Sequence, residues 1–208
     1  MTKDNAENKN DKQGTPTPTL LCIPDISGFT KFMGSTNFEM SSKVIPSLLN
    51  KIVYSNEIGM KISEIEGDAV LFYRHGELPP FKKLMEQCHF IYTEFYKQME
   101  TLRKEHVDKG GDKIPEMLGL KIVLHYGMEI GSVPVGTRIK LMGEDVIVAH
   151  RLLKNNIESD EYILITQTLL DIYGEEKITR SFEWGDLQDG HIEVEHLGRV
   201  NFNYIDLN

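Results

Sequence analysis

Asp-Ile-Ser-Gly-Phe-Thr, residues 25–30, is the stretch of sequence that decides the fold, together with Glu-Ile-Glu-Gly-Asp-Ala-Val-Leu at residues 64–71. Each stretch places an aspartate, Asp25 or Asp68, at the end or the turn of an apolar run. The two carboxylates can therefore converge on one end of a sheet, as a divalent-metal site for phosphoryl transfer requires. Each aspartate alone also suits a structural role, Asp25 as a helix N-cap and Asp68 as a hairpin-turn residue.

The chain around these two stretches alternates between strand and helix patterns. A helix is expected to open after Gly28 and another after Gly143, and apolar spacing predicts further helices in residues 38–53, 81–106 and 167–173. Strands are predicted in residues 20–23, 60–65, 69–73, 119–126, 128–135, 162–165, 192–195 and 200–205, with a turn at Tyr126-Gly127. The order βαββαβ predicts an α+β fold, a ferredoxin-like or palm-type sheet with helices on one face.

Length and composition favour one folded domain. Residues 1–18 are polar and contain almost nothing apolar, so they are predicted to be a disordered tail. Residues 19–208 then form the domain, because a chain of 208 residues with 40% hydrophobic content can bury one sizeable core. A net charge of −9 argues against general nucleic-acid binding, which depends on basic residues that neutralise phosphates.

The apolar segments predict a cytoplasmic protein. No uninterrupted apolar run approaches the roughly 18 residues of a membrane span, and the N-terminus lacks the basic-then-apolar order of a signal peptide. Cys22 and Cys88 each lie inside an apolar segment and are too few for a disulfide framework. They are therefore interpreted as buried free thiols of a reducing compartment.

A third motif gives the first two a context. Residues 143–152 read Gly-Glu-Asp-Val-Ile-Val-Ala-His-Arg-Leu, and together the three motifs resemble the catalytic domain of class III nucleotidyl cyclases, the adenylate and guanylate cyclase family. The resemblance covers residues 20–206, nearly the whole predicted domain. It implies conversion of a nucleoside triphosphate into a 3′,5′-cyclic nucleotide and pyrophosphate, with two divalent ions, Mg²⁺ or Mn²⁺. It also implies a homodimer in which one protomer gives the metal aspartates and the other gives the arginine and the ribose contacts.

The resemblance assigns the metal and phosphate ligands residue by residue. Asp25 and Asp68 would bridge the two ions, and the carbonyl of Ile26 would complete their coordination. Backbone N–H groups at the helix start, contributed by Gly28, Phe29 and Thr30, would face the phosphates.

The third motif and the C-terminal region supply the remaining family positions. Arg151 matches the arginine that stabilises charge on the transferring phosphate, although it also suits a surface position at a helix end. Ile147 replaces the asparagine that positions the ribose, and Leu197 replaces a phosphate-binding lysine. Arg199, two residues further on, either substitutes for that lysine or is a solvated strand residue. His150 and Lys154 flank Arg151 as candidate replacement phosphate contacts.

Base selection in the family depends on the positions of Glu64 and Lys140. Glu64 matches the guanylate type, while Lys140 matches neither type, so GTP is slightly favoured over ATP. The same pair could recognise adenine with its polarity reversed, or the two side chains could simply pair with each other. His125 lies among apolar strand residues and is expected to be a satisfied sheet histidine.

Two functions remain open from the sequence. The first is a homodimeric nucleotidyl cyclase, favoured by both metal carboxylates. The second is a catalytically silent cyclase homology domain that binds a nucleotide or a partner as a regulatory module, favoured by Ile147 and Leu197.

Overall fold

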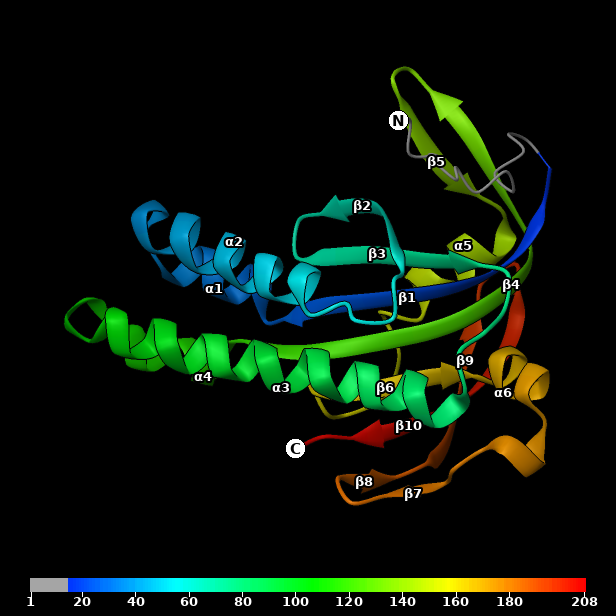
Figure 1. Ribbon diagram of the computed structural model, residues 1–208. Helices are drawn as coiled ribbons and strands as arrows, with labels where there is room; N and C mark the ends of the chain where they lie inside the picture. The colour runs from blue at the N-terminus through cyan, green and yellow to red at the C-terminus, as the bar shows by residue number, and fades with distance from the viewer. Residues whose placement is uncertain (1–14) are drawn as a thin grey trace, which may run out of the picture.

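A computed structural model describes residues 15–208, including every side chain there except those of Lys109 and Arg138. Its main sheet has eight strands in the order β2-β3-β1-β4-β6-β10-β9, with β5 paired to β4 outside this path (Figure 1). The strands are β1 (Thr17–Ser27), β2 (Lys61–Glu66), β3 (Ala69–His75), β4 (Gly119–Val135), β5 (Arg138–Met142), β6 (Tyr162–Thr166), β9 (Gln188–Val194) and β10 (Gly198–Asp206). β4 and β6 run parallel, and the other pairs in this sheet are antiparallel.

Helices fill the connections between these strands. They are α1 (Phe29–Ser35), α2 (Phe38–Tyr54), α3 (Phe81–Glu105), α4 (Ile114–Met117), α5 (Glu144–Arg151) and α6 (Gln167–Tyr173), with short 3-10 turns at Val107–Lys109, Gly111–Lys113 and Glu175–Lys177. A small hairpin of β7 (Ser181–Phe182) and β8 (Gly185–Asp186) precedes β9. Within residues 15–208, no helix is both long enough and apolar enough to cross a bilayer.

The predicted α+β class is confirmed, and the arrangement of the helices differs in one respect from the prediction. Leu20 and Cys22 of β1 share one core with α2, α3 and α6, whereas Leu21 and Ile23 pack with α5 in a second core. Because neighbouring strand residues point to opposite faces, α5 covers the face opposite the other helices. The central strand is therefore buried on both sides, which explains its almost unbroken apolar sequence.

The apolar stripe predicted for the long helix is confirmed. Five α3 side chains are each at most 1% exposed and lie in the larger core: Leu84, Cys88, Ile91, Phe95 and Met99. The neighbouring helix α2 begins after Asn37, whose side chain accepts a hydrogen bond from the N–H of Met40 at 2.9 Å. Cys22 and Cys88 are buried free thiols, as expected.

The predicted turn at Tyr126-Gly127 is wrong, because β4 runs through it as one strand of 17 residues. Tyr126 and Gly127 stay in register with Leu20 and Thr19 of β1. A Cβ at Gly127 would lie 2.4 Å from the Cβ of Asp145, so this glycine permits a close approach of α5. The second half of β4 then pairs with β5 in a hairpin that projects beyond the rest of the sheet (Figure 1).

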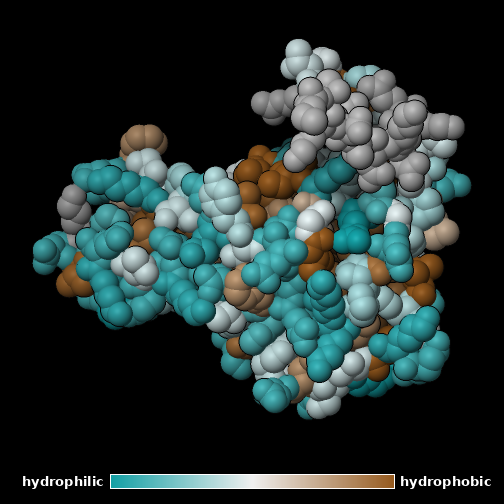
Figure 2. Space-filling view, in the orientation of Figure 1, coloured by the Kyte–Doolittle hydropathy of each residue, from teal (hydrophilic) through white to brown (hydrophobic). Residues whose placement is uncertain are grey.

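The viewed surface is mainly hydrophilic, in keeping with the net charge of −9 (Figure 2). An apolar patch stands out beside β2 in the same view, and this end strand exposes Ile62 and Ile65. Of the predicted disordered tail, residues 1–14 lie outside the described part of the chain, and residues 17 and 18 belong to β1.

Candidate functional site

Asp25 and Asp68 are brought to one site by the pairing of β1 with the β2–β3 hairpin. Asp25 lies opposite Ala69 in the register of β1 and β3, and the N–H of Ile26 donates to the carbonyl of Asp68 at 3.0 Å. Gly67 precedes Asp68 with a φ of 61°, a left-handed turn conformation that glycine adopts easily. The backbone therefore fixes Asp68 beside the buried end of β1, as the two motifs predicted.

The two carboxylates lie where negative charge is costly. Burial raises the pKa of Asp25, and the charge of Asp68 raises it further, against the opposing effect of Lys121. Burial also raises the pKa of Asp68 above its usual value. A cation placed between these groups would relieve both effects.

Lys121 is the functional side chain that sequence reasoning missed. It lies opposite Asp25 in the register of β1 and β4, and its ammonium is 3.1 Å from Asp25 Oδ2. The same ammonium donates to the carbonyl of Leu153 at 3.1 Å. The sequence does show that Lys121 interrupts an otherwise apolar strand. It does not show that Lys121 faces Asp25, because that contact depends on the register of β1 and β4.

The carboxylates and the end of α5 share a cavity of about 620 Å³. Its lining comprises Asp25, Asp68, Lys121, Val146, Ile147, His150, Arg151, Leu153 and Lys154. Arg151 and Lys154 are exposed, and neither makes an ion pair with another residue of the described chain. His150 is close enough to act electrostatically on both Asp25 and Glu64. A single chain thus gathers two carboxylates and several basic side chains around one cavity.

A hydrogen-bonded chain anchors α5 over the sheet. His125 is buried in β4, with Nδ1 3.0 Å from Thr166 Oγ1 and Nε2 3.0 Å from Asp145 Oδ1. Asp145 Oδ2 accepts from the N–H of Met128 at 3.0 Å. The hydrogen bond from His125 lowers the pKa of Asp145 below its usual value. The expectation of a satisfied sheet histidine is confirmed, and this histidine orients the helix that carries Arg151.

Gly143 makes the same approach possible at the start of α5. Its φ is 152°, and a Cβ there would lie 2.6 Å from the carbonyl oxygen of Glu129. The glycine of the third motif therefore allows α5 to start directly against β4.

Gly28, Phe29 and Thr30 are not part of the cavity lining. β1 continues to Ser27, and Gly28 caps α1 with a φ of 75°. A Cβ at Gly28 would lie 1.8 Å from the carbonyl oxygen of Met117, so the structure explains this glycine by close packing against α4.

The two C-terminal positions also lie outside the cavity lining. Arg199 is exposed on β10, and its Nε donates to Asn201 Oδ1 at 3.0 Å. Leu197 packs against the apolar cluster that contains Phe202. Within the single chain, then, Arg199 does not line the cavity that holds Asp25.

Glu64 and Lys140 pair with each other, which is one of the three alternatives that the sequence left open. Lys140 Nζ lies 2.9 Å from Glu64 Oε2 and 3.6 Å from Glu66 Oε1. Burial alone would raise the pKa of Glu64, but hydrogen bonds from Lys140 and Glu66 bring it below its usual value. The pair lies outside the cavity lining and links β2 to β5.

The donor set at the aspartates fits Mg²⁺ or Mn²⁺. Asp25 and Asp68 offer carboxylate oxygens, and Mg²⁺ commonly binds one or two carboxylates while it keeps several waters. Ile26, the third predicted ligand, is not part of the cavity lining. Among residues 15–208, no cluster of three or more His, Cys, Asp or Glu side chains is placed to hold a metal.

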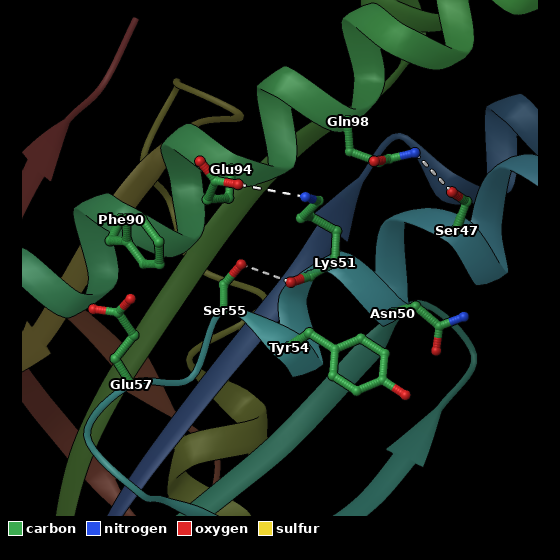
Figure 3. Close-up of a pocket in the computed structure, with 9 residues that line it drawn as sticks. All are labelled: Ser47, Asn50, Lys51, Tyr54, Ser55, Glu57, Phe90, Glu94 and Gln98. Carbon is green, nitrogen blue, oxygen red and sulfur yellow. Dashed lines mark hydrogen bonds and ion pairs between the residues drawn. The ribbon is translucent and has the colours of Figure 1, made fainter.

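A second cavity, of about 350 Å³, lies between α2 and α3 (Figure 3). Its polar groups pair across the two helices: Lys51 Nζ lies 3.4 Å from Glu94 Oε2, and Gln98 donates to Ser47 Oγ at 2.9 Å. None of the predicted site residues lines it. We interpret these contacts as the polar seam that joins the two helices.

Comparison with known proteins places this geometry among relatives. The family model "Protein of unknown function (DUF2652)" matches residues 45–162, more than half of the chain. The chain is also similar to "Uncharacterized protein Rv2561/Rv2562" of Mycobacterium tuberculosis, with 29% identity over 164 residues that cover 72% of this chain and 67% of that protein.

Several solved structures share the fold. The guanylyl cyclase Cya2 matches with a TM-score of 0.68 and 17% identity over 93% of each chain. The adenylyl cyclase CyaB from P. aeruginosa matches with a TM-score of 0.63 and 20% identity, over 92% of this chain and 94% of that one. The guanylate cyclase domain of RhGC from Catenaria anguillulae, in complex with GTP, matches with a TM-score of 0.61 and 16% identity, over 92% and 97%. The chain has the fold of class III nucleotidyl cyclase catalytic domains.

Proposed function

We propose that this chain, which belongs to the family of proteins of unknown function DUF2652, is a nucleotidyl cyclase that works as a homodimer with two Mg²⁺ or Mn²⁺ ions. The observation that carries the proposal is the shared cavity of Asp25, Asp68 and the basic end of α5. The raised pKa values of the buried Asp25 and the half-buried Asp68 call for cations, and the basic side chains at the end of α5 suit a triphosphate.

The proposed reaction is the attack of the ribose 3′-hydroxyl on the α-phosphate, with pyrophosphate as the leaving group. The divalent ions would stabilise negative charge on the phosphate oxygens. Asp25 and Asp68 hold the ions, while Arg151 supplies a permanently charged guanidinium for the phosphate that is transferred. Lys154, which follows the end of α5 and also lines the cavity, adds a second positive charge.

The homodimer is proposed because Arg151 is exposed and unpaired within the described chain, whereas Asp25 already has a cationic neighbour from its own protomer. In a two-fold pair, the exposed Arg151 of each copy can serve the aspartates of the other copy, although it also lines the cavity beside the aspartates of its own chain. We also propose a slight preference for GTP, from Glu64, once the nucleotide base separates it from Lys140.

The competing function is a silent cyclase homology domain that acts as a regulatory or nucleotide-binding module. Ile147 favours it, because an alkyl side chain that lines the cavity with 55% exposure cannot orient a ribose hydroxyl. Loss of one preorganised contact typically costs about 3 kcal/mol, on the order of a hundredfold in rate. The cyclase proposal therefore expects a slow enzyme.

One assay separates the two functions. The purified chain is incubated with ATP, GTP, CTP or UTP and with Mn²⁺ or Mg²⁺, and cyclic products are identified by mass spectrometry. We expect a cyclic nucleotide whose formation falls about a hundredfold in Arg151→Ala. The matched control is Arg180→Ala, which removes an exposed arginine paired with Glu175 outside the cavity. Absence of any cyclic product from the wild-type chain with all four nucleotides would favour the silent module.

A further inference from the structure

We propose that Lys121 serves two partners in turn: it neutralises Asp25 while the site holds no metal, and it moves to the phosphates of the nucleotide when a divalent cation takes Asp25. The second half rests on the proposed function. The first half concerns only the metal-free protein.

The contact with Asp25 is built into the sheet. The two residues face each other across β1 and β4, and their charged atoms lie 3.1 Å apart. The side chain of Lys121 is 21% exposed and that of Asp25 is 12% exposed, so water screens the pair only weakly. The ammonium already occupies Asp25 Oδ2, and a divalent cation bound to the same carboxylate would be repelled by it. A cation must therefore displace Lys121 from Asp25.

The displaced ammonium of Lys121 has a second hydrogen-bond partner in the same cavity. Its other partner is the carbonyl of Leu153 at 3.1 Å, at the wall formed by the end of α5. Lysine is a compact point charge on a flexible stem, so a short movement transfers it from a carboxylate to a phosphate oxygen. The residue at the family lysine position, Leu197, lies outside this cavity lining, so Lys121 supplies from β4 the positive charge that Leu197 lacks.

The test compares binding of Mn²⁺ alone with binding of a nucleotide. Mn²⁺ affinity without nucleotide is measured by electron paramagnetic resonance of the free ion, for wild type, Lys121→Met and Lys121→Arg. We expect Lys121→Met to bind Mn²⁺ about tenfold more tightly than wild type, equivalent to about 1.4 kcal/mol. Lys121→Arg keeps the charge and should bind Mn²⁺ as wild type does.

The same variants are then titrated with a non-hydrolysable GTP analogue at saturating Mn²⁺, by calorimetry. We expect Lys121→Met to bind the analogue about tenfold more weakly than wild type. Lys43→Met is the matched control, because it removes an exposed lysine that pairs with Glu39 outside this cavity. It should leave the Mn²⁺ affinity within about twofold of wild type.

Opposite changes in the two affinities separate an exchange of partners from a structural role, because a distorted site would weaken both. Mn²⁺ binding to Lys121→Met that is no tighter than to wild type overturns the inference, and so does tighter binding of both ligands. Melting temperatures of all variants are recorded, and Lys121→Gln replaces Lys121→Met if the latter does not fold. If wild type forms no cyclic product but Lys121→Met gains Mn²⁺ affinity, the proposed function fails while the competition at Asp25 stands. If wild type is an active cyclase and the Mn²⁺ affinity is unchanged, only the inference fails.

Discussion

Mixing two inactive variants tests where the arginine of each site comes from. Asp68→Ala removes a metal carboxylate, and Arg151→Ala removes the guanidinium of α5. Asp68 is the better choice for this experiment than Asp25, because removal of Asp25 would leave Lys121 without its carboxylate partner. Each variant alone is expected to form product at about 1% of the wild-type rate or less.

The size of the recovery follows from two-fold symmetry. Random exchange of equal amounts makes about half of the dimers mixed, and both lesions then fall in one of the two sites. The other site is intact, so the mixture should reach about a quarter of the wild-type rate per protomer. Cyclic product is quantified by mass spectrometry, and native mass spectrometry of differently tagged copies confirms that mixed dimers form.

The result that refutes this arrangement is equally clear. Asp68 and Arg151 line one cavity in each protomer. If a protomer uses its own arginine, every site in the mixed dimer carries one lesion. A rate no higher than that of the separate variants, in a sample where mixed dimers are demonstrated, would assign each active site to a single protomer.

Three further predictions concern contacts seen in the structure. Asp145→Ala should lower the free energy of unfolding in urea by about 2–3 kcal/mol, because a carboxylate that accepts from His125 and the backbone is lost, and Asp145→Asn should cost less. Folding lowers the pKa of Asp145, so its ionised form contributes stability that is fully present above the ordinary pKa of 3.8. The difference in unfolding free energy between wild type and Asp145→Asn, measured in urea, should therefore disappear as the pH falls through the lowered pKa. Mn²⁺ should raise the melting temperature of wild type and not that of Asp68→Ala. Because the pKa of Asp68 is raised, its protonation should weaken the increase in melting temperature at a higher pH than for an ordinary aspartate. Lys140→Met should change stability little, because Lys140 is 45% exposed, and should alter the ratio of GTP to ATP turnover if Glu64 reads the base.

The sequence predicted the fold because its motifs carry local and tertiary information together. Asp25 lies near the end of one apolar run and Asp68 directly precedes another, so their convergence follows once the strands β1 and β3 pair. The stripe of α3 was equally plain, because helical spacing alone defines which side chains are buried.

The parts that were missed depend on which strands meet and in what register. Gly127 was interpreted as a turn because its sequence neighbours do not reveal that Asp145 passes directly over it. Lys121 meets Asp25, and Glu64 meets Lys140, through pairings between distant segments that no local pattern encodes. The position of α5 on the opposite face of the sheet was also missed. Strand β1 is apolar on both faces, and an unbroken apolar run does not say which helix covers each face.

The unbroken course of β4 has a structural consequence. One end of this strand carries Lys121 beside Asp25, and the other end forms the projecting hairpin with β5. That hairpin exposes three apolar side chains, those of Val135, Ile139 and Met142. The projecting hairpin and the lysine that pairs with Asp25 therefore belong to a single backbone element, although they lie at its two ends.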